Sequence, residues 1–221
     1  MHQWFVYTEF NEASKAAADF LSSKIKASIA KKDICHVILP GGNTPAICLA
    51  HLAEKKLPWN KIHWYPGDER CYPLGHAERN DVMLEKNLWS QLPDTHIHTI
   101  PAELGAEQAA DIYREIIKPV DNFDIAFLGM GEDGHTASLF PGNDALTDMR
   151  SVIPVYHSPK APDERVSFSI NTLKNADCRM VLASGHTKAD IIRRIKNGEA
   201  LPINCIGDIH WYLDKAALST C

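Results

Sequence analysis

Short apolar runs alternate along this chain with longer segments in which apolar residues recur at helical spacing. The apolar runs predict β-strands at residues 4–7, 34–39, 62–65, 123–128 and 179–183. After the first run, Ala17, Leu21, Ile25 and Ile29 recur every four positions, which predicts a helix that Asn11 caps and that ends near Lys32. Strands that alternate with helices favour a mostly parallel sheet with helices on both faces.

The remaining pattern continues this alternation to the end of the chain. Thr44 at an N-cap and Pro45 at the first helical position predict the start of a second helix. Further helices are predicted at residues 82–92, 106–118 and 186–196, and further strands at residues 96–100, 152–156 and 166–170. Residues 210–213 are predicted to add an edge strand. We therefore expect residues 1–221 to form one three-layer, Rossmann-like α/β domain.

Composition excludes several classes of protein. A net charge of −5 and the lack of any long basic run argue against a nucleic-acid binder. No apolar stretch approaches the length of a membrane span, and the N-terminus lacks a signal-peptide pattern. The six cysteines are scattered without Cys-x-x-Cys spacing, which argues against a disulfide framework. We therefore expect a cytoplasmic protein that acts on a small molecule, as a monomer or a small homo-oligomer.

A glycine-rich loop at residues 129–142 follows the predicted strand 123–128 and carries the strongest chemical signal. Asp133 and His135 lie in it, just beyond the carboxyl end of the strand, where open α/β sheets bind ligands. Residues 129–134 also match the dinucleotide pattern G-x-G-x-x-G. However, Pro141 and Gly142 would cut short the helix that a dinucleotide site requires, and no carboxylate follows the next strand. We interpret the glycines as shaping a catalytic loop.

Two other loops follow predicted strands. Gly41, Gly42 and Asn43 precede the helix that starts at Thr44, so their free N–H groups and the helix dipole suit an anion. A tight turn with a helix cap is an equally good reading of these residues alone, and the position after a buried strand favours a ligand. Residues 67–70 place Asp68 and Arg70 beside a glycine, which suits substrate orientation. Taken alone, that segment is more typical of a solvated turn.

Two cations complete the set of candidates. Arg165 precedes an alternating strand, and Lys188 lies in the first turn of the predicted helix 186–196. A cation there opposes the helix dipole, which is reasonable if an anion binds nearby, although an ordinary exposed lysine fits too. His96 and His98 share one face of a predicted strand, but no third ligand accompanies them at a metal-site spacing. We therefore interpret them as surface histidines and predict no metal site.

Six segments occur in one order along the chain and resemble the 6-phosphogluconolactonase family. They are PGGNTP at 40–45, GDER at 67–70, Asn80, GMGEDGHTASLFPG at 129–142, residues 162–167 and SGHTKA at 184–189. The resemblance covers nearly the whole chain, and the long glycine–histidine segment is its most specific part. Two positions depart from the family pattern, which usually has serine where Asn43 stands and an aromatic residue where Asp81 stands.

The resemblance implies hydrolysis of 6-phospho-D-glucono-1,5-lactone to 6-phosphogluconate in the oxidative pentose phosphate pathway, without a cofactor. It also implies the fold of glucosamine-6-phosphate deaminases and ribose-5-phosphate isomerases. His135 resembles the general base, Asp68 and Arg70 resemble active-site residues, and Arg165 and Lys188 resemble phosphate ligands. The full set expected at the site adds Asp133 to the catalytic group, and Gly41, Gly42, Asn43, Thr44, Asn80 and Gly131 to the substrate-binding group.

Our hypothesis for the mechanism is base catalysis. A neutral His135 takes a proton from the water that attacks the lactone carbonyl, since imidazole is largely neutral near pH 7. Asp133 or Asp68 fixes the imidazole tautomer, and Arg70 or loop N–H groups stabilise the oxyanion.

Two rival hypotheses remain at this stage. A deaminase or isomerase of the same fold is the nearer one, but deaminases carry an Asn-Glu pair about five residues after the histidine, where this chain has Leu139-Phe140-Pro141. A non-catalytic sugar-phosphate sensor is the other. Sensors usually join this fold to a DNA-binding segment, and a first strand near Trp4 leaves no room for one.

Overall fold

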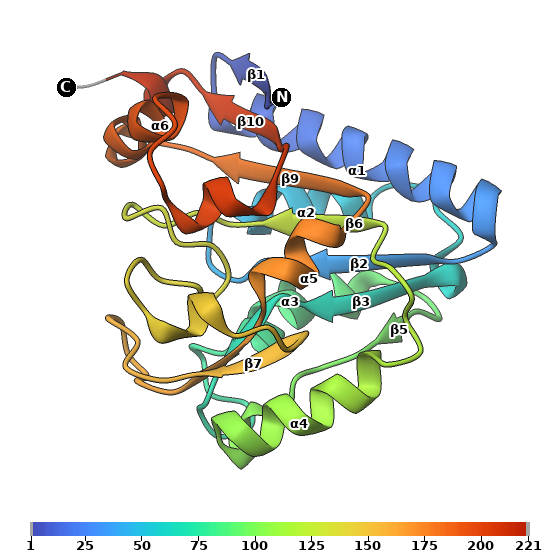
Figure 1. Ribbon diagram of the computed structural model, residues 1–221. Coiled ribbons are helices and arrows are strands. Elements are labelled where there is room, and N and C mark those ends of the chain that lie inside the picture. The colour runs from blue at the N-terminus through green and yellow to red at the C-terminus, as the bar shows by residue number, and fades with distance from the viewer. Residues whose placement is uncertain (1, 220–221) are drawn as a thin grey trace.

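A computed structural model describes residues 2–219 and contains two β-sheets (Figure 1). The larger is a seven-stranded parallel sheet in the order β1-β10-β9-β6-β2-β3-β5, and the smaller is a three-stranded antiparallel sheet in the order β4-β8-β7. The strands are β1 (Gln3–Tyr7), β2 (Cys35–Leu39), β3 (Ile62–Pro66), β4 (Asp68–Arg70), β5 (His96–Ile97), β6 (Ile125–Leu128), β7 (Val152–Val155), β8 (Arg165–Phe168), β9 (Cys178–Ala183) and β10 (His210–Asp214). The α-helices are α1 (Phe10–Lys32), α2 (Pro45–Ala53), α3 (Asn80–Asn87), α4 (Ala106–Ile117), α5 (Ile170–Asn175) and α6 (Ala189–Lys196).

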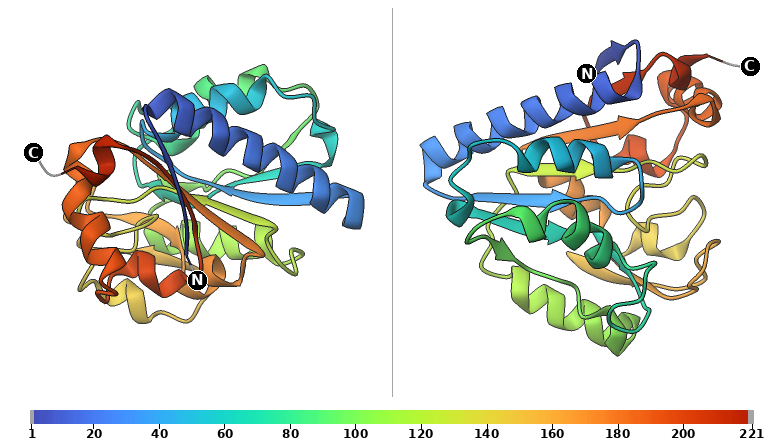
Figure 2. Two further views of the ribbon diagram at one scale, coloured as in Figure 1. Left: turned by 90° about the horizontal axis from the view of Figure 1, so that it is seen from above. Right: turned by 180° about the vertical axis from the view of Figure 1, so that it is seen from behind.

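Helices cover both faces of the large sheet, which confirms the predicted three-layer α/β fold (Figure 2). Alternate residues of each strand enter opposite layers because side chains on a strand point to opposite faces. In β2, Val37 and Leu39 pack with α1, α2 and α3, whereas Ile38 packs with α4, α5 and α6. The strands are therefore buried on both sides, as parallel sheets require.

The small antiparallel sheet was not predicted. Segments 152–156 and 166–170 were expected as strands among parallel neighbours, and residues 67–70 were expected as a loop. Instead β7 and β8 form an antiparallel pair, and β4 pairs with β8. The physical reason is the connection at residues 156–164, which is too short for a parallel crossover but sufficient for an antiparallel return.

The prediction of β10 as an edge strand was wrong. β10 lies between β1 and β9, and the N-terminal strand β1 forms the edge. Ring contacts hold this pair, since Trp4 stacks on Trp211 with centroids 4.9 Å apart and Phe5 stacks on Tyr212 at 5.0 Å. Pairing between the two ends of a chain depends on such long-range contacts, which local patterns do not reveal.

Several helix boundaries differ from the prediction. Glu9, not Asn11, is the N-cap of α1, because the Glu12 carboxylate accepts the backbone N–H groups of Thr8 and Glu9. Thr44 stands at the N-cap of α2 as predicted, but its side chain makes no capping hydrogen bond.

Three other predicted segments are also shifted. α3 begins at Asn80 and is followed by a 3₁₀ turn at Trp89–Gln91. The segment after β9 begins as a 3₁₀ turn, His186–Lys188, so Lys188 precedes α6 rather than lying in its first turn. The predicted strand 96–100 is reduced to the two residues of β5.

Within residues 2–219, no helix combines the length and the apolar character that crossing a bilayer requires. The five cysteines in this range are free, and Cys35, Cys48 and Cys178 are buried as small core residues. Cys221 lies outside the described residues.

Four histidines gather on one face of the large sheet. His36, His63 and His96 stand at the same register on the neighbouring strands β2, β3 and β5. The His63 and His96 rings stack with centroids 4.2 Å apart, and Nδ1 of His63 lies 2.9 Å from Nε2 of His98. The sequence interpretation of His96 and His98 as ordinary surface residues was therefore incomplete, because it missed their partners on other strands.

This histidine cluster is expected to weaken the fold in acid. Burial, followed by the neighbouring imidazoles, lowers the pKa of His63 from 6.5 to about 4. The unfolded chain then binds more protons between these values, so the free energy of unfolding is highest above about pH 6.5 and falls as the pH drops toward 4. Thermal unfolding between pH 7.5 and 4.5 tests this, and His63→Gln should flatten the dependence. His157→Asn is the control, since His157 is 91% exposed, and equal slopes in wild type and His63→Gln would contradict the prediction.

Candidate active site

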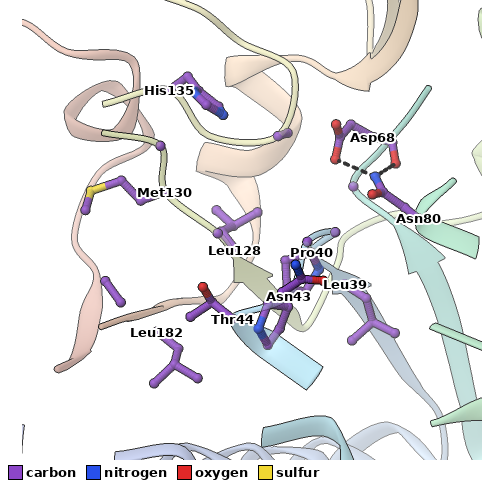
Figure 3. Close-up of a pocket in the computed structure, with 18 of the residues that line it drawn as sticks. Leu39, Pro40, Asn43, Thr44, Asp68, Asn80, Leu128, Met130, His135 and Leu182 are labelled. Atoms are coloured by element: carbon purple, nitrogen blue, oxygen red, sulfur yellow. Dashed lines mark hydrogen bonds between the residues drawn. The ribbon is translucent and has the colours of Figure 1, made fainter. Parts of the chain in front are cut away.

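The carboxyl ends of β2, β3, β6 and β9 meet at a cavity of about 220 Å³. This is the sheet edge at which the sequence predicted a ligand site. The cavity brings together every predicted site residue except Asp133, namely Gly41, Gly42, Asn43, Thr44, Asp68, Arg70, Asn80, Gly131, His135, Arg165 and Lys188. Figure 3 shows His135 and Asp68 on opposite sides of this space, with Asn43 and Thr44 below them.

Asp133 lies behind His135 and orients its ring. Oδ1 of Asp133 is 2.5 Å from Nδ1 of His135 and also accepts the His135 backbone N–H at 3.2 Å. Because a carboxylate only accepts, Nδ1 carries the proton and Nε2 keeps its lone pair. The question that the sequence left open between Asp133 and Asp68 is therefore answered by this contact.

Burial sets the protonation state of this pair. Only 15% of the His135 side chain is exposed, and its ring packs on Phe140 with centroids 4.6 Å apart. Desolvation lowers the pKa of His135, although Asp133 acts in the opposite direction. For Asp133, burial would raise the pKa, but His135 and its hydrogen bonds lower it on balance. A neutral imidazole beside an ionised carboxylate is the resulting state near pH 7.

The loop that carries His135 requires a glycine at position 131. A Cβ on Gly131 would lie 2.1 Å from Nδ1 of His135 and 2.5 Å from Oδ1 of Asp133. The Gly131 N–H also donates to the His135 carbonyl at 2.9 Å, which closes the loop upon itself. Gly131 therefore shapes the loop that carries His135.

Asp68 has partners of its own on the other side of the cavity. Its Oδ2 accepts the Ser138 hydroxyl at 2.6 Å, and its Oδ1 accepts the Asn80 amide at 3.2 Å (Figure 3). The Asn80 carboxamide in turn packs on Gly41, where a Cβ would lie 1.9 Å from Oδ1 of Asn80. One wall of the cavity is thus a packed unit of four separate chain segments.

Cations form another wall. Arg70 and Arg165 stand directly opposite each other on β4 and β8, an arrangement that is unfavourable without an anion between or beside them. Nη2 of Arg165 donates to the carbonyls of Lys160 and Ala161 at 3.0 and 2.9 Å, and its guanidinium lies 5.5 Å from the Phe140 ring centroid. Burial lowers the pKa of Arg165. The guanidinium is therefore held rigidly at low exposure.

Lys188 reaches the same cavity from the segment after β9. Its Nζ donates to the Met130 carbonyl at 2.9 Å, and burial lowers its pKa. Lys160 also lines the cavity and lies close enough to influence both Lys188 and His135. Four basic side chains thus line one small space.

Sequence reasoning missed three residues of this region. Lys160 was overlooked, although it is the basic residue of the loop that precedes β8. Ser138 lies inside the glycine–histidine motif but was given no role. Glu69 was treated only as one charge of a turn, yet it is fully buried. Within residues 2–219, no three histidine, cysteine or acidic side chains are arranged to hold a metal ion.

Comparison with known proteins places this chain in a family. The profile of the family described as "Glucosamine-6-phosphate isomerases/6-phosphogluconolactonase" matches residues 9–212. A 6-phosphogluconolactonase of Thermotoga maritima is 34% identical over 193 residues, which cover 83% of this chain and 86% of that protein. A 6-phosphogluconolactonase of Mycobacterium leprae is 30% identical over 235 residues, with 96% and 95% covered. These matches confirm the family resemblance drawn from the sequence.

Solved structures agree with this result. The crystal structure of 6-phosphogluconolactonase from Thermotoga maritima superposes with a TM-score of 0.90 at 28% identity, covering 97% of this chain and all of that one. The 6-phosphogluconolactonase from Trypanosoma cruzi gives 0.87 at 28% identity, with 98% and 96% covered. A monomeric glucosamine-6-phosphate deaminase gives 0.85 at 18% identity over 98% of this chain and all of that one, which shows a shared fold alone.

Proposed function

Because this chain belongs to the family of glucosamine-6-phosphate isomerases and 6-phosphogluconolactonases, we propose that it hydrolyses 6-phospho-D-glucono-1,5-lactone to 6-phospho-D-gluconate. One observation favours hydrolysis over the rival functions. A neutral imidazole, oriented by Asp133, shares a cavity with four basic side chains. A base for water and a binding site for an anion are the two parts that this reaction needs. The reaction would belong to the oxidative pentose phosphate pathway.

The hydrolytic step uses His135 twice. Nε2 removes a proton from a water molecule while the water oxygen forms a bond to C1 of the lactone. The π electrons of the C1 carbonyl move onto the carbonyl oxygen, which becomes the oxyanion. The tetrahedral intermediate then collapses, the C1–O5 bond breaks, and the imidazolium returns the proton to O5. Asp133 keeps Nδ1 protonated and stabilises the transient imidazolium. No covalent nucleophile is required, because a lactone is an activated ester.

The negative charges of the oxyanion and the phosphate are balanced by the cation wall, which consists of the four basic side chains at the cavity: Arg70, Lys160, Arg165 and Lys188. Arg70 or loop N–H groups stabilise the oxyanion, and Arg165 and Lys188 bind the 6-phosphate, with Lys160 beside them. The N-terminus of α2 at Thr44 offers further N–H groups to the substrate. Asp68, held by Ser138 and Asn80, is placed to accept a sugar hydroxyl. Binding energy remote from C1 then serves to orient the reacting carbonyl.

The test is proton release from freshly prepared phosphogluconolactone, corrected for spontaneous ring opening. Catalysed release is expected, and it should be unchanged after treatment with EDTA because we predict that no metal takes part. Ammonia released from glucosamine 6-phosphate would instead support the deaminase. Tight binding of sugar phosphate without turnover would support the sensor. Burial of Leu139 and Phe140 in the core argues against the deaminase, since no carboxylate enters there.

Lys188→Ala is expected to weaken binding of the phosphorylated lactone and to leave the unphosphorylated lactone nearly unaffected. A hydrogen bond to a charged group contributes about 1.5–3 kcal/mol, so KM for the phosphorylated substrate should rise roughly 10- to 100-fold. Steady-state kinetics with both lactones measures this. Lys196→Ala is the control, because Lys196 lies on α6 over the Trp4 ring rather than at the cavity. Equal losses with both lactones would refute the phosphate assignment.

A further inference from the structure

Glu69 is a fully buried carboxylate between two residues that line the cavity, Asp68 and Arg70. It lies in β4 between Asp68 and Arg70, so its side chain points away from the face that they share. Its Oε1 accepts the backbone N–H groups of Asn80 at 2.7 Å and Arg70 at 2.8 Å, and its Oε2 accepts that of Asp81 at 2.8 Å. One side chain thus binds the backbone of β4 and the N-terminus of α3.

Each of these three N–H groups belongs to a residue at the site or next to one. Asn80 donates its side-chain amide to the Asp68 carbonyl at 2.8 Å and to the Asp68 carboxylate, and it packs on Gly41. Arg70 projects into the cavity from the same strand as Asp68. A shift of the α3 N-terminus would therefore move Asn80, and with it the support of Asp68 and of the glycine loop.

The surroundings of Glu69 hold few compensating charges. The buried Arg79 at the N-cap of α3 influences Glu69, but its guanidinium donates to Asp81 and Glu103. The carboxylate of Asp81 on α3 repels that of Glu69. The other titratable groups near enough to interact with Glu69 are Cys71 and Tyr113, and its negative charge contributes to raising the pKa of each. Burial, opposed by the three N–H bonds, raises the pKa of Glu69 to about 7.

We propose that Glu69 is a positioning residue whose ionised carboxylate holds Asn80 and Arg70 in the geometry that catalysis requires. This inference rests on the proposed lactone hydrolysis. Protonation removes the negative charge and turns one oxygen into an O–H group, which is a poorer acceptor, so the three N–H bonds to Glu69 weaken. As the pH falls through about 7, the folded protein takes up this proton and activity declines. Burial lowers the pKa of His135 below 6.5, so its own protonation limits activity only at lower pH.

The decisive variant is Glu69→Gln, which is neutral at every pH. The pH profile of kcat/KM for wild type should show an acidic limb near pH 7. In Glu69→Gln the rate at pH 8 should fall about tenfold, and the limb should move below pH 6.5 to the value set by His135. Asp124→Asn is the matched control, because Asp124 is a buried carboxylate that accepts the His36 N–H at 2.8 Å away from the cavity. It should lose stability but keep the wild-type limb, whereas an unchanged rate and limb in Glu69→Gln would overturn the proposal.

A second measurement on wild type does not depend on the variant folding. Hydrogen exchange should show that the protection factors of the Asn80 and Asp81 amides fall as the pH decreases through 7. Constant protection factors there would also overturn the proposal. Absence of lactone hydrolysis by wild type would refute the proposed function instead, since the exchange experiment reports on Glu69 without any substrate.

Discussion

Replacing His135 by alanine is expected to lower kcat by roughly 10²- to 10⁴-fold while KM for the phosphorylated lactone stays within about threefold of wild type. The imidazole is the proposed base, whose Nδ1 bonds to Asp133, and the phosphate is assigned instead to Arg165 and Lys188. Removing it should therefore raise the barrier of the hydrolytic step without removing substrate affinity. Initial rates of proton release over a range of lactone concentrations give both constants.

His51→Ala is the control for this experiment. His51 lies on α2, and its ring bonds to the Asn11 side chain rather than lining the cavity. It should retain wild-type kinetics. Turnover of His135→Ala within a factor of two of wild type would remove His135 from the role of base and leave the proposed mechanism without one.

Gly131→Ala is expected to reduce kcat by at least about 100-fold, almost as much as loss of the imidazole itself. The added methyl group would lie 2.1 Å from Nδ1 of His135, far inside van der Waals contact, so the Asp133–His135 pair cannot keep its arrangement. The ring must turn, and Nε2 no longer faces the position of the attacking water. The measurement is kcat together with the thermal unfolding temperature, which shows that the variant is folded.

Gly129→Ala is the matched control in the same loop. A Cβ at Gly129 would find its nearest neighbours at 3.9 Å, which is an ordinary contact. This variant should keep most of the activity. If Gly131→Ala were as active as Gly129→Ala, the close approach of the loop backbone to His135 would have no catalytic importance.

Much of the site was accessible from the sequence because its parts are local. The glycines, Asp133 and His135 occupy one short loop after one strand, so their proximity follows from chain connectivity. The alternation of strands and helices is likewise a local periodicity, and it predicted the three-layer architecture correctly. The carboxyl ends of parallel strands share one sheet edge, which explains why loops far apart in the chain were correctly expected to meet.

Features that depend on pairing across the chain were not accessible in this way. The sequence allowed either Asp133 or Asp68 to orient His135, and only the folded positions, with Asp68 held by Ser138 and Asn80, decide between them. The pairing of β4 with β8, which sets Arg70 against Arg165, also has no local signature.

What the sequence by itself determined is therefore the alternation of strands and helices, the three-layer architecture, and the chemical groups carried by each loop. The tertiary structure decided which carboxylate serves the imidazole, which strand is the edge, and that Glu69 lies buried under Asn80. The physical reason is the distance along the chain over which each kind of interaction acts. Periodicity and capping act within one or two turns of the chain. The contacts that hold Asp68 to Ser138, pair β1 with β10 and bury Glu69 under Asn80 instead join separate segments, which meet only when the two apolar layers pack against the sheet.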